Sequence, residues 1–343
     1  MEILLTPMTS ARKPTRIRAR QSAPATRVRF NTILVPTDFS RLSQQAIRWA
    51  KFMAQPSHGT VHLIHVHDFE FAIPADVALE LISPVDVDRM LQEDLCRVAA
   101  KHDLPNPKKT CHLRSGRAFD QIGKLAEEIE ADLIVTSTHG YTGLQHAILG
   151  STAERTVRHA TRPVLVARSA KAGRVRAPRL KKIVVPLDFS KCSKIALRYA
   201  INLARCFNAR LFLVHIVRLD YRLMADGYAM YAAEEIMKGA HEAAEEEMRR
   251  LVAATDFGKA EFETSIETGS PEIRVCSYAR EVAADVIVAS THGRTGFRHV
   301  LIGSTAEQIV RDAECPVLVV PARQEMQLLP HGFGSDSAPR YRR

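Results

Sequence analysis

Two short glycine-rich segments carry the residues with the clearest chemical potential in this sequence. Gly140 is followed after nine residues by Gly150 and Ser151, and the same pattern begins again at Gly293. A glycine just beyond a strand lets an anion approach backbone amides without a Cβ in the way. A glycine and a hydroxyl at the start of a helix add unpaired N–H groups, and the helix dipole favours negative charge there. This spacing is compatible with phosphate binding.

A purely structural interpretation of the two segments stays open. Ser151-Thr-Ala-Glu154 and Ser304-Thr-Ala-Glu307 both fit a capping box, in which Ser and Glu satisfy the first turn of a helix. The capping box does not account for the recurring glycines, which are Gly140, Gly143, Gly150, Gly293, Gly296 and Gly303. Neither the P-loop pattern nor Gly-x-Gly-x-x-Gly occurs in the chain, so a nucleotide site would need another geometry.

Two aspartates and three histidines are further candidates for chemistry. Asp38 and Asp188 each follow an apolar β-branched run. Such an Asp, or the Ser two residues later, commonly caps the next helix, and the alternative is a carboxylate that accepts a hydrogen bond from the amino group of an adenine. Histidine is a common metal ligand, and three occur close together in the sequence, at His62, His65 and His67. Strand alternation places His62 on the opposite face from the other two, which disfavours metal ligation.

The elements that must position these residues occur twice in the chain. The segment 32–40 returns as 182–190, and the segment 132–140 returns as 285–293. The chain is therefore a duplication of one domain of about 140 residues. Apolar runs alternate with helical patterns in each copy, which predicts two tandem α/β domains, each a doubly wound five-stranded parallel sheet. The predicted strands lie near residues 32–36, 60–66, 108–113, 131–136 and 163–167, and near 182–186, 210–216, 260–266, 284–290 and 316–320.

Length, cysteines and charge distribution limit the class of protein. A chain of 343 residues, 46% hydrophobic and 25% charged, is typical of a soluble protein with two domains, and it holds no apolar run long enough to span a membrane. Six cysteines without Cys-x-x-Cys spacing favour a reducing compartment, so we expect a cytoplasmic protein. Residues 1–30, 168–182 and 321–343 carry net charges of +6, +7 and +2, so the remainder of this chain of net charge +10 is acidic.

These patterns divide the chain into five parts. We expect a disordered basic segment over residues 1–27, a first domain over 28–168, a basic linker over 169–180, a second domain over 181–322 and a flexible tail over 323–343.

The motifs resemble those of the universal stress protein family. The matching elements are Pro-x-Asp-x-Ser after the first strand, a histidine before Val66 and Ile216 in the second, Thr-His-Gly with its glycine loop after the fourth, and Pro-Val-Leu-Val in the last. The resemblance covers about residues 30–168 and 181–321. The ATP-binding branch of that family has Gly-x2-Gly-x9-Gly-Ser/Thr, and here Ser137 and Ser290 replace the first glycine.

The resemblance implies an adenine nucleotide alpha hydrolase-like fold that binds ATP, with or without Mg²⁺. Asp38 and Asp188 would hold adenine with the backbone of the second strand, Ser137 and Ser290 would lie by the ribose, and the glycine loops would take the phosphates. The implied site residues of the first repeat are Pro36, Thr37, Asp38, Val66, Ser137, His139, Gly140, Gly143, Gly150, Ser151 and Thr152. Those of the second repeat are Pro186, Leu187, Asp188, Ile216, Ser290, His292, Gly293, Gly296, Gly303, Ser304 and Thr305.

The resemblance also implies how the two domains pack. Family members commonly dimerise through the last strand, so Val164–Ala167 and Val317–Val320 are expected to pair antiparallel within this chain as an intramolecular pseudo-dimer. Physically this fits, because exposed apolar edge strands otherwise invite aggregation. Further homodimerisation is left open.

We therefore expect an ATP-binding regulatory protein of the stress response, which is no enzyme beyond a slow ATPase. The alternative is a nucleotide-independent scaffold that acts through contacts with an unidentified protein partner. Specific nucleic-acid binding is disfavoured, because the basic charge lies on the termini and the linker and no face combines basic with aromatic residues. No membrane partner is expected.

Overall fold

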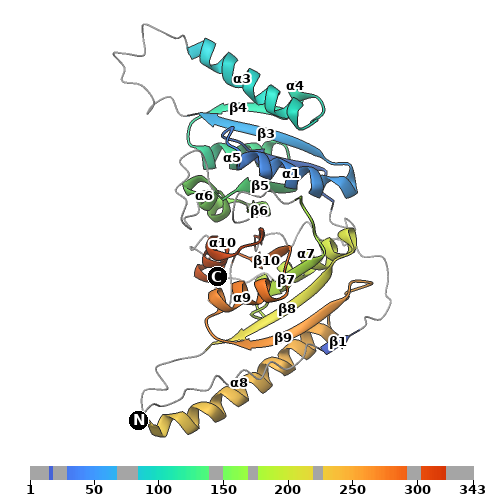
Figure 1. Ribbon diagram of the computed structural model, residues 1–343, viewed down its shortest axis with the longest axis vertical. Coiled ribbons are helices and arrows are strands. Elements are labelled where there is room, and N and C mark those ends of the chain that lie inside the picture. Colours follow the sequence, from blue (N-terminus) through green and yellow to red (C-terminus); the bar gives the residue numbers. More distant parts are fainter. Residues whose placement is uncertain are drawn as a thin grey trace, which may run out of the picture.

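The computed structural model describes residues 15–17, 29–67, 84–138, 150–168, 177–218, 227–291 and 303–321. Two α/β domains lie end to end along the long axis of the molecule, the first in blue to green and the second in yellow to red (Figure 1). Within the described residues, no helix is both long enough and apolar enough to cross a membrane.

Eleven strands of the described residues form one continuous sheet, in the order β1-β9-β8-β7-β10-β11-β6-β5-β2-β3-β4. The strands of domain 1 are β2 (Thr32–Pro36), β3 (Thr60–His67), β4 (Cys111–Ser115), β5 (Leu133–Ser137) and β6 (Val164–Ala167). Those of domain 2 are β7 (Lys182–Pro186), β8 (Arg210–Val217), β9 (Phe262–Thr268), β10 (Val286–Ser290) and β11 (Val317–Val320). Within each domain all five strands run parallel, as predicted.

Helices connect the strands and cover both faces of the sheet. In domain 1 these are α1 (Ser43–Ala54) with the short 3₁₀ turn η1 (Gln55–Ser57), α3 (Pro84–Lys101), α4 (Pro107–Thr110), α5 (Ala118–Glu128) and α6 (Ser151–His159). In domain 2 they are α7 (Lys191–Phe207), α8 (Gly227–Ala253), α9 (Pro271–Glu281) and α10 (Ser304–Asp312).

The near-continuous apolar strands bury both of their faces. In β2, Ile33 and Val35 belong to one hydrophobic core, and Leu34 between them belongs to the other. The first core is closed by residues of α1, α3, α7 and α8, and the second by residues of α5, α6, α9 and α10. Both cores contain residues of both domains, so the hydrophobic interior continues from one domain into the next.

The two domains are joined at the middle of the sheet by β6 and β11. These strands pair antiparallel, with Leu165 opposite Leu318, and their residues are buried. The expected intramolecular pseudo-dimer through the last strands is confirmed. On one side of this seam the rings of Phe52 and Phe207 stack with their centroids 4.9 Å apart.

Four charged side chains link α6 and α10 on the other side of the seam. Arg158 contacts both Glu154 at 2.9 Å and Glu307 at 3.2 Å, and Arg311 contacts the same two carboxylates at 3.7 and 3.3 Å. Arg168, at the end of domain 1, donates to the last carbonyl groups of α10. A cation at the carboxyl end of a helix is favoured by the helix dipole. The seam therefore combines sheet pairing, aromatic stacking and ion pairs.

The structure differs from the expectations at two places. Strand β1 (Thr15–Ile17) lies within the segment expected to be disordered and pairs antiparallel with β9, with Arg16 opposite Glu263. The third strand of domain 1 was predicted from residue 108, but it begins at Cys111 because α4 occupies the preceding residues. Pro107 begins that helix, at a position where its missing N–H costs no hydrogen bond.

Candidate functional site

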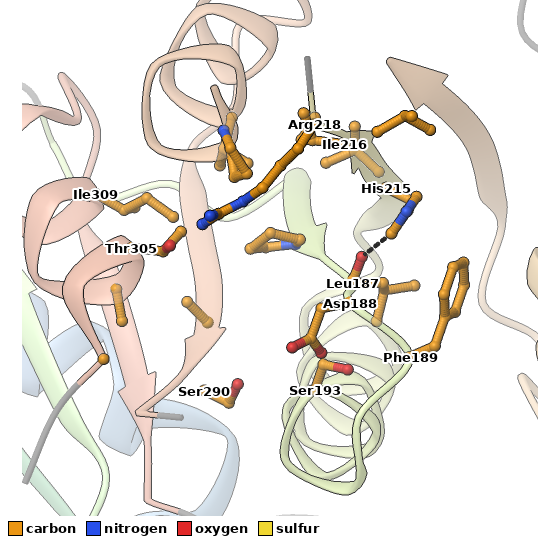
Figure 2. A pocket seen from close by; sticks show the side chains of 18 of the residues that line it. Leu187, Asp188, Phe189, Ser193, His215, Ile216, Arg218, Ser290, Thr305 and Ile309 are labelled. Carbon is orange, nitrogen blue, oxygen red and sulfur yellow. Dashed lines mark hydrogen bonds between the residues drawn. The ribbon is translucent and has the colours of Figure 1, made fainter. Parts of the chain in front are cut away.

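A cavity of about 630 Å³ opens in domain 2 at the carboxyl ends of β7, β8 and β10 (Figure 2). Strand β7, the first of its domain, lies between β8 and β10, so the strand order reverses there. Open parallel sheets bind ligands at this switch point. The volume is within the range of about 300–1,000 Å³ that is usual for small-molecule sites.

The cavity collects eight of the residues that the sequence singled out in the second repeat. They are Pro186, Leu187, Asp188, Ile216, Ser290, Gly303, Ser304 and Thr305. The segments 186–188 and 303–305 lie far apart in the sequence but form opposite sides of one pocket (Figure 2). His292, Gly293 and Gly296 lie outside the described residues, so their prediction is not tested.

The turn after β7 shows which residue caps the next helix. The Oδ1 atom of Asp188 accepts a hydrogen bond from the N–H of Ser190 at 3.0 Å, which closes a tight turn. The hydroxyl of Ser190 then accepts from the N–H of Ser193 at 3.2 Å and is the cap of α7. Serine is therefore the helix cap, and the Asp188 side chain lines the cavity beside it.

A histidine and a phenylalanine hold this turn in place, and the sequence interpretation missed both roles. The Nδ1 atom of His215 donates to the carbonyl oxygen of Leu187 at 2.6 Å. The His215 ring stacks on Phe189, with ring centroids 4.4 Å apart. Phe189 has a φ of 64°, which bulky residues rarely adopt, and such strain persists only where neighbouring contacts enforce it. These contacts fix the direction in which the turn presents Asp188.

The start of α10 forms the opposite side of the cavity. The N–H of Gly303 donates to the carbonyl oxygen of Thr291 at 2.7 Å, which holds the helix start against the end of β10. Gly303 is the N-cap, and no side chain caps the helix. Its φ of −73° and ψ of 146° are open to any residue, so backbone strain does not explain the glycine. A bare helix start at a cavity wall is an arrangement that suits an anion.

The capping-box interpretation is wrong for both repeats. The N-cap is the glycine, Gly150 or Gly303, and the serine that follows is the first helical residue. Glu154 and Glu307 lie one position too late to return to the cap, and they form the ion pairs of the seam instead. The serines Ser151 and Ser304 are therefore not explained by helix capping.

Domain 1 repeats the same local geometry. Asp38 accepts from the N–H of Ser40 at 3.0 Å, and His65 Nδ1 contacts the carbonyl oxygen of Thr37 at 2.8 Å. Phe39 again has a φ of 64° and contacts His65, with ring centroids 4.3 Å apart. Burial lowers the pKa of His65 from its ordinary value, so the ring is held as the neutral imidazole.

The other predicted residues of domain 1 lie at the corresponding strand ends. The N–H of Gly150 donates to the carbonyl oxygen of Thr138 at 2.7 Å, which places the start of α6 beside the end of β5. The Thr37 side chain is turned into the loop, where its hydroxyl contacts Ser43 at 3.0 Å. Pro36, Val66 and Ser137 are the last or nearly last residues of β2, β3 and β5, and Ser151 and Thr152 open α6. His139, Gly140 and Gly143 lie outside the described residues.

The three histidines of β3 have separate partners. His65 is bound to the Thr37 carbonyl as described, whereas the Nδ1 atom of His62 lies 3.0 Å from Nε2 of His112 on β4. His67 lies 3.1 Å from a carboxylate oxygen of Asp88 on α3. Within the described part of the chain, no group of three or more His, Cys, Asp or Glu side chains is arranged to hold a metal ion.

Several lining residues were not predicted from the sequence. Helix α8 contributes Ala240, Ala243 and Ala244, whose small side chains at helical spacing leave room for the cavity. Two charged side chains, Arg218 and Glu247, also line the cavity. The spacing of these three alanines could have been recognised in the sequence, because residues three and four positions apart lie on one helix face.

Comparisons with known proteins agree with this architecture. A family model described as the universal stress protein family matches residues 29–168 and again residues 179–321. A universal stress protein of Methanocaldococcus jannaschii is 33% identical over 142 residues, which are 41% of this chain and 81% of that protein. Universal stress protein G of Escherichia coli O157:H7 is 34% identical over 149 residues, which are 40% of this chain and 99% of that protein. Each of these matches thus spans about the length of one repeat.

Solved structures extend the likeness to both domains. The crystal structure of a universal stress protein from Archaeoglobus fulgidus DSM 4304 matches with a TM-score of 0.55 at 19% identity and covers 86% of this chain and 97% of that one. A functionally unknown protein from Pseudomonas aeruginosa PAO1 matches with a TM-score of 0.57 at 20% identity, covering 85% and 92%. These two likenesses show the fold. Because the family model matches twice and spans most of the sequence, this chain belongs to the universal stress protein family, with two family domains in tandem.

Proposed function

We propose that this chain binds adenine nucleotides, with ATP as the principal ligand, with or without Mg²⁺, and serves as a regulatory protein in the stress response. One observation carries the proposal. A single cavity brings the Asp188 turn, the end of β8 at Ile216 and the uncapped start of α10 together at the switch point of the sheet. A heteroaromatic base has groups complementary to the Asp188 turn and the end of β8, and a polyphosphate has groups complementary to the start of α10.

Each side of the cavity suits a different part of the ligand. A carboxylate at Asp188 accepts a hydrogen bond from an exocyclic amino group, and the backbone of Ile216 at the strand end supplies the second polar contact to the base. Ser290, at the end of β10, lies between the two sides and suits the ribose. The amides and hydroxyls of Ser304 and Thr305 suit the phosphates, because the first turn of a helix leaves its N–H groups unpaired.

The proposed role is binding rather than turnover, with at most slow hydrolysis of ATP. The histidine at the cavity, His215, is hydrogen-bonded to the Leu187 carbonyl and stacked on Phe189, so it supports the turn. The proposed location is the cytoplasm, which is consistent with six cysteines that are all free thiols.

Titration calorimetry of the full chain with ATP and Mg²⁺ tests the proposal. We expect saturable binding at two sites per chain. Gly303→Val should remove the domain-2 site and Gly150→Val the domain-1 site, because a branched side chain would cover the bare helix start. Gly123→Val is the matched control, since a Cβ at Gly123 meets nothing within 4 Å.

Two results would contradict the proposal. One is the absence of saturation at millimolar ATP with a folded protein, and the other is unchanged ATP binding in the Gly150→Val/Gly303→Val double variant. Circular dichroism of every variant separates loss of binding from loss of fold. Mass spectrometry of nucleotide that co-purifies with the wild-type chain gives an independent readout.

A further inference from the structure

We propose that Arg218 is the phosphate clamp of the domain-2 cavity, so that this site selects nucleoside di- and triphosphates over the uncharged nucleoside. The inference rests on the proposed nucleotide binding and deepens it, because it assigns the ligand class of one site to one side chain. Arg218 belongs to no motif found in the sequence, and the evidence for it is its place in the fold.

The register of β8 directs Arg218 toward the cavity. Side chains along a strand alternate between the two faces of a sheet, so Val214, Ile216 and Arg218 share one face. Val214 and Ile216 pack in the core that α9 and α10 cover. Arg218 is the next residue in this series, just beyond the end of the strand, and it lines the cavity. Figure 2 shows its side chain extending across the pocket toward the side where Thr305 lies.

In the described part of the chain, the cavity is lined by two carboxylates, Asp188 and Glu247, and by one cation, which is placed to act as a clamp. Among the described residues that line it, Arg218 is the one lysine or arginine, and it faces the start of α10 from the opposite wall. An anion between them would contact the N–H groups of a helix start on one side and a guanidinium on the other. The planar guanidinium binds phosphate through two parallel hydrogen bonds, and the positive end of the helix dipole adds to the attraction.

A structural role for Arg218 is the competing explanation. Arg218 acts on Glu272 at the start of α9, where the pKa of the carboxyl lies below its usual range, first because the Ser270 hydroxyl binds it and to a lesser extent because of Arg218. The Arg218 side chain is exposed, so an ion pair with Glu272 would contribute little to stability. If that were its role, the loss of Arg218 would not discriminate between ligands.

The two repeats differ at this position. The second strands align so that His65 matches His215 and Val66 matches Ile216, and Arg218 then matches Asp68. Asp68 lies outside the described residues. The clamp is therefore a property of the second repeat, and the two sites of the chain are expected to differ in their preference for polyphosphates.

The test uses the full chain carrying Gly150→Val, so that ligand binding is measured at the domain-2 site alone. Titration calorimetry measures ATP, ADP and adenosine binding to this protein and to versions that also carry Arg218→Ala or Arg218→Lys. We expect Arg218→Ala to weaken ATP binding by about tenfold or more, as for loss of hydrogen bonds between charged groups, and to leave adenosine binding within about twofold. Arg218→Lys should retain part of the ATP affinity, because it keeps the charge and loses the paired hydrogen bonds.

Arg249→Ala is the matched control, since it removes the same charge from the exposed side of α8. It should leave all three affinities unchanged. The inference is overturned if Arg218→Ala leaves ATP binding unchanged, or if it weakens ATP and adenosine by the same factor. Failure of the folded parent protein to bind any of the three ligands would overturn nucleotide binding at the domain-2 site and the clamp together, whereas the other outcomes concern the clamp alone.

Discussion

At the scale of single residues, each domain builds its strand-one turn from the same three side chains. An aspartate binds the amide two residues ahead, a phenylalanine between them takes a positive φ, and a histidine from the next strand secures the carbonyl before the aspartate. The repetition of this strained turn in both domains indicates that its geometry is needed. The aspartate was visible in the sequence, whereas the histidine gained a role only through the pairing of β2 with β3 and of β7 with β8.

Replacement of His215 should lower both the stability of the protein and its affinity for ATP at the domain-2 site. His215→Ala removes the hydrogen bond to Leu187 and the stacking partner of Phe189, so the turn that presents Asp188 loses its support. We expect unfolding free energy to fall by about 1–2 kcal/mol, as for a buried hydrogen bond with an aromatic contact. ATP affinity of the domain-2 site should fall by about tenfold, measured by titration calorimetry, because the free turn must be reordered on binding.

His62→Ala is a matched control for that variant. It removes another half-buried strand histidine with one ring-nitrogen contact, in the other domain. It should lower the melting temperature similarly and leave ATP binding to domain 2 unchanged. Equal effects of the two variants on ATP affinity would argue that the histidine contributes only to general stability.

At the scale of elements, the alternation of strands and helices was predicted correctly in both repeats. The central strands of each domain carry near-continuous apolar runs that are buried on both faces, and this pattern can be recognised without tertiary information. The cavity was harder to predict from the sequence, because it forms between the ends of three strands, β7, β8 and β10, and the helices α8 to α10. Arg218 illustrates the reason, since alternation along β8 indicates the face of the sheet on which it lies but not that a cavity opens on that face.

A pair of histidines on the neighbouring strands β3 and β4 should make domain 1 sensitive to acid. His62 and His112 stack with ring centroids 5.3 Å apart, and burial lowers the pKa of each, with the neighbouring His62 lowering that of His112 further. Above the ordinary value of 6.5 both rings are neutral in the folded and the unfolded chain. As the pH falls below it, the unfolded chain takes up protons first, so stability decreases toward the lowered folded pKa values.

We therefore expect the melting temperature to fall between about pH 7.5 and pH 5.5. His112→Gln keeps a hydrogen-bonding side chain without a titrating ring and should reduce this pH dependence, as measured by thermal unfolding at both pH values. His58→Gln, at an exposed position directly after η1, should leave the pH dependence as it is in the wild type. If the melting temperature of His112→Gln depends on pH as strongly as that of the wild type, the stacked histidine pair is not the source of the pH dependence.

At the scale of the whole molecule, one sheet runs through both domains and its seam is covered on both sides. The pairing of β6 with β11 was predicted from the family resemblance and is present. The ion pairs between α6 and α10 were not predicted, because the two glutamates had been interpreted as capping residues. Those helices begin directly after the two glycines proposed to hold phosphate, so the ion pairs join the phosphate-side helices of the two proposed sites.

The seam ion pairs should stabilise the protein in a salt-dependent way. Replacing Arg158 and Arg311 by alanine leaves Glu154 and Glu307 facing each other across the seam without cations. We expect the unfolding free energy to fall by about 1 kcal/mol at low salt and by less at high salt, because these side chains are partly exposed and therefore screened. Urea denaturation at the two salt concentrations measures the difference.

The double variant Arg249→Ala/Arg250→Ala serves as the control, since these arginines pair with Glu246 and Glu247 along the exposed helix α8. It should change the unfolding free energy by no more than about 0.5 kcal/mol. If the seam variant loses the same unfolding free energy at both salt concentrations, the arginines act through packing instead of charge.

The joining of β6 and β11 within one polypeptide has a consequence for how the protein responds to dilution. Two separate chains that meet through such strands dissociate when their concentration falls below the dissociation constant. Here the partner strand is tethered, so its effective concentration is set by the connecting segment and not by the number of copies in the cell. The paired arrangement therefore persists when expression is low, and every newly made molecule contains both domains in a one-to-one ratio.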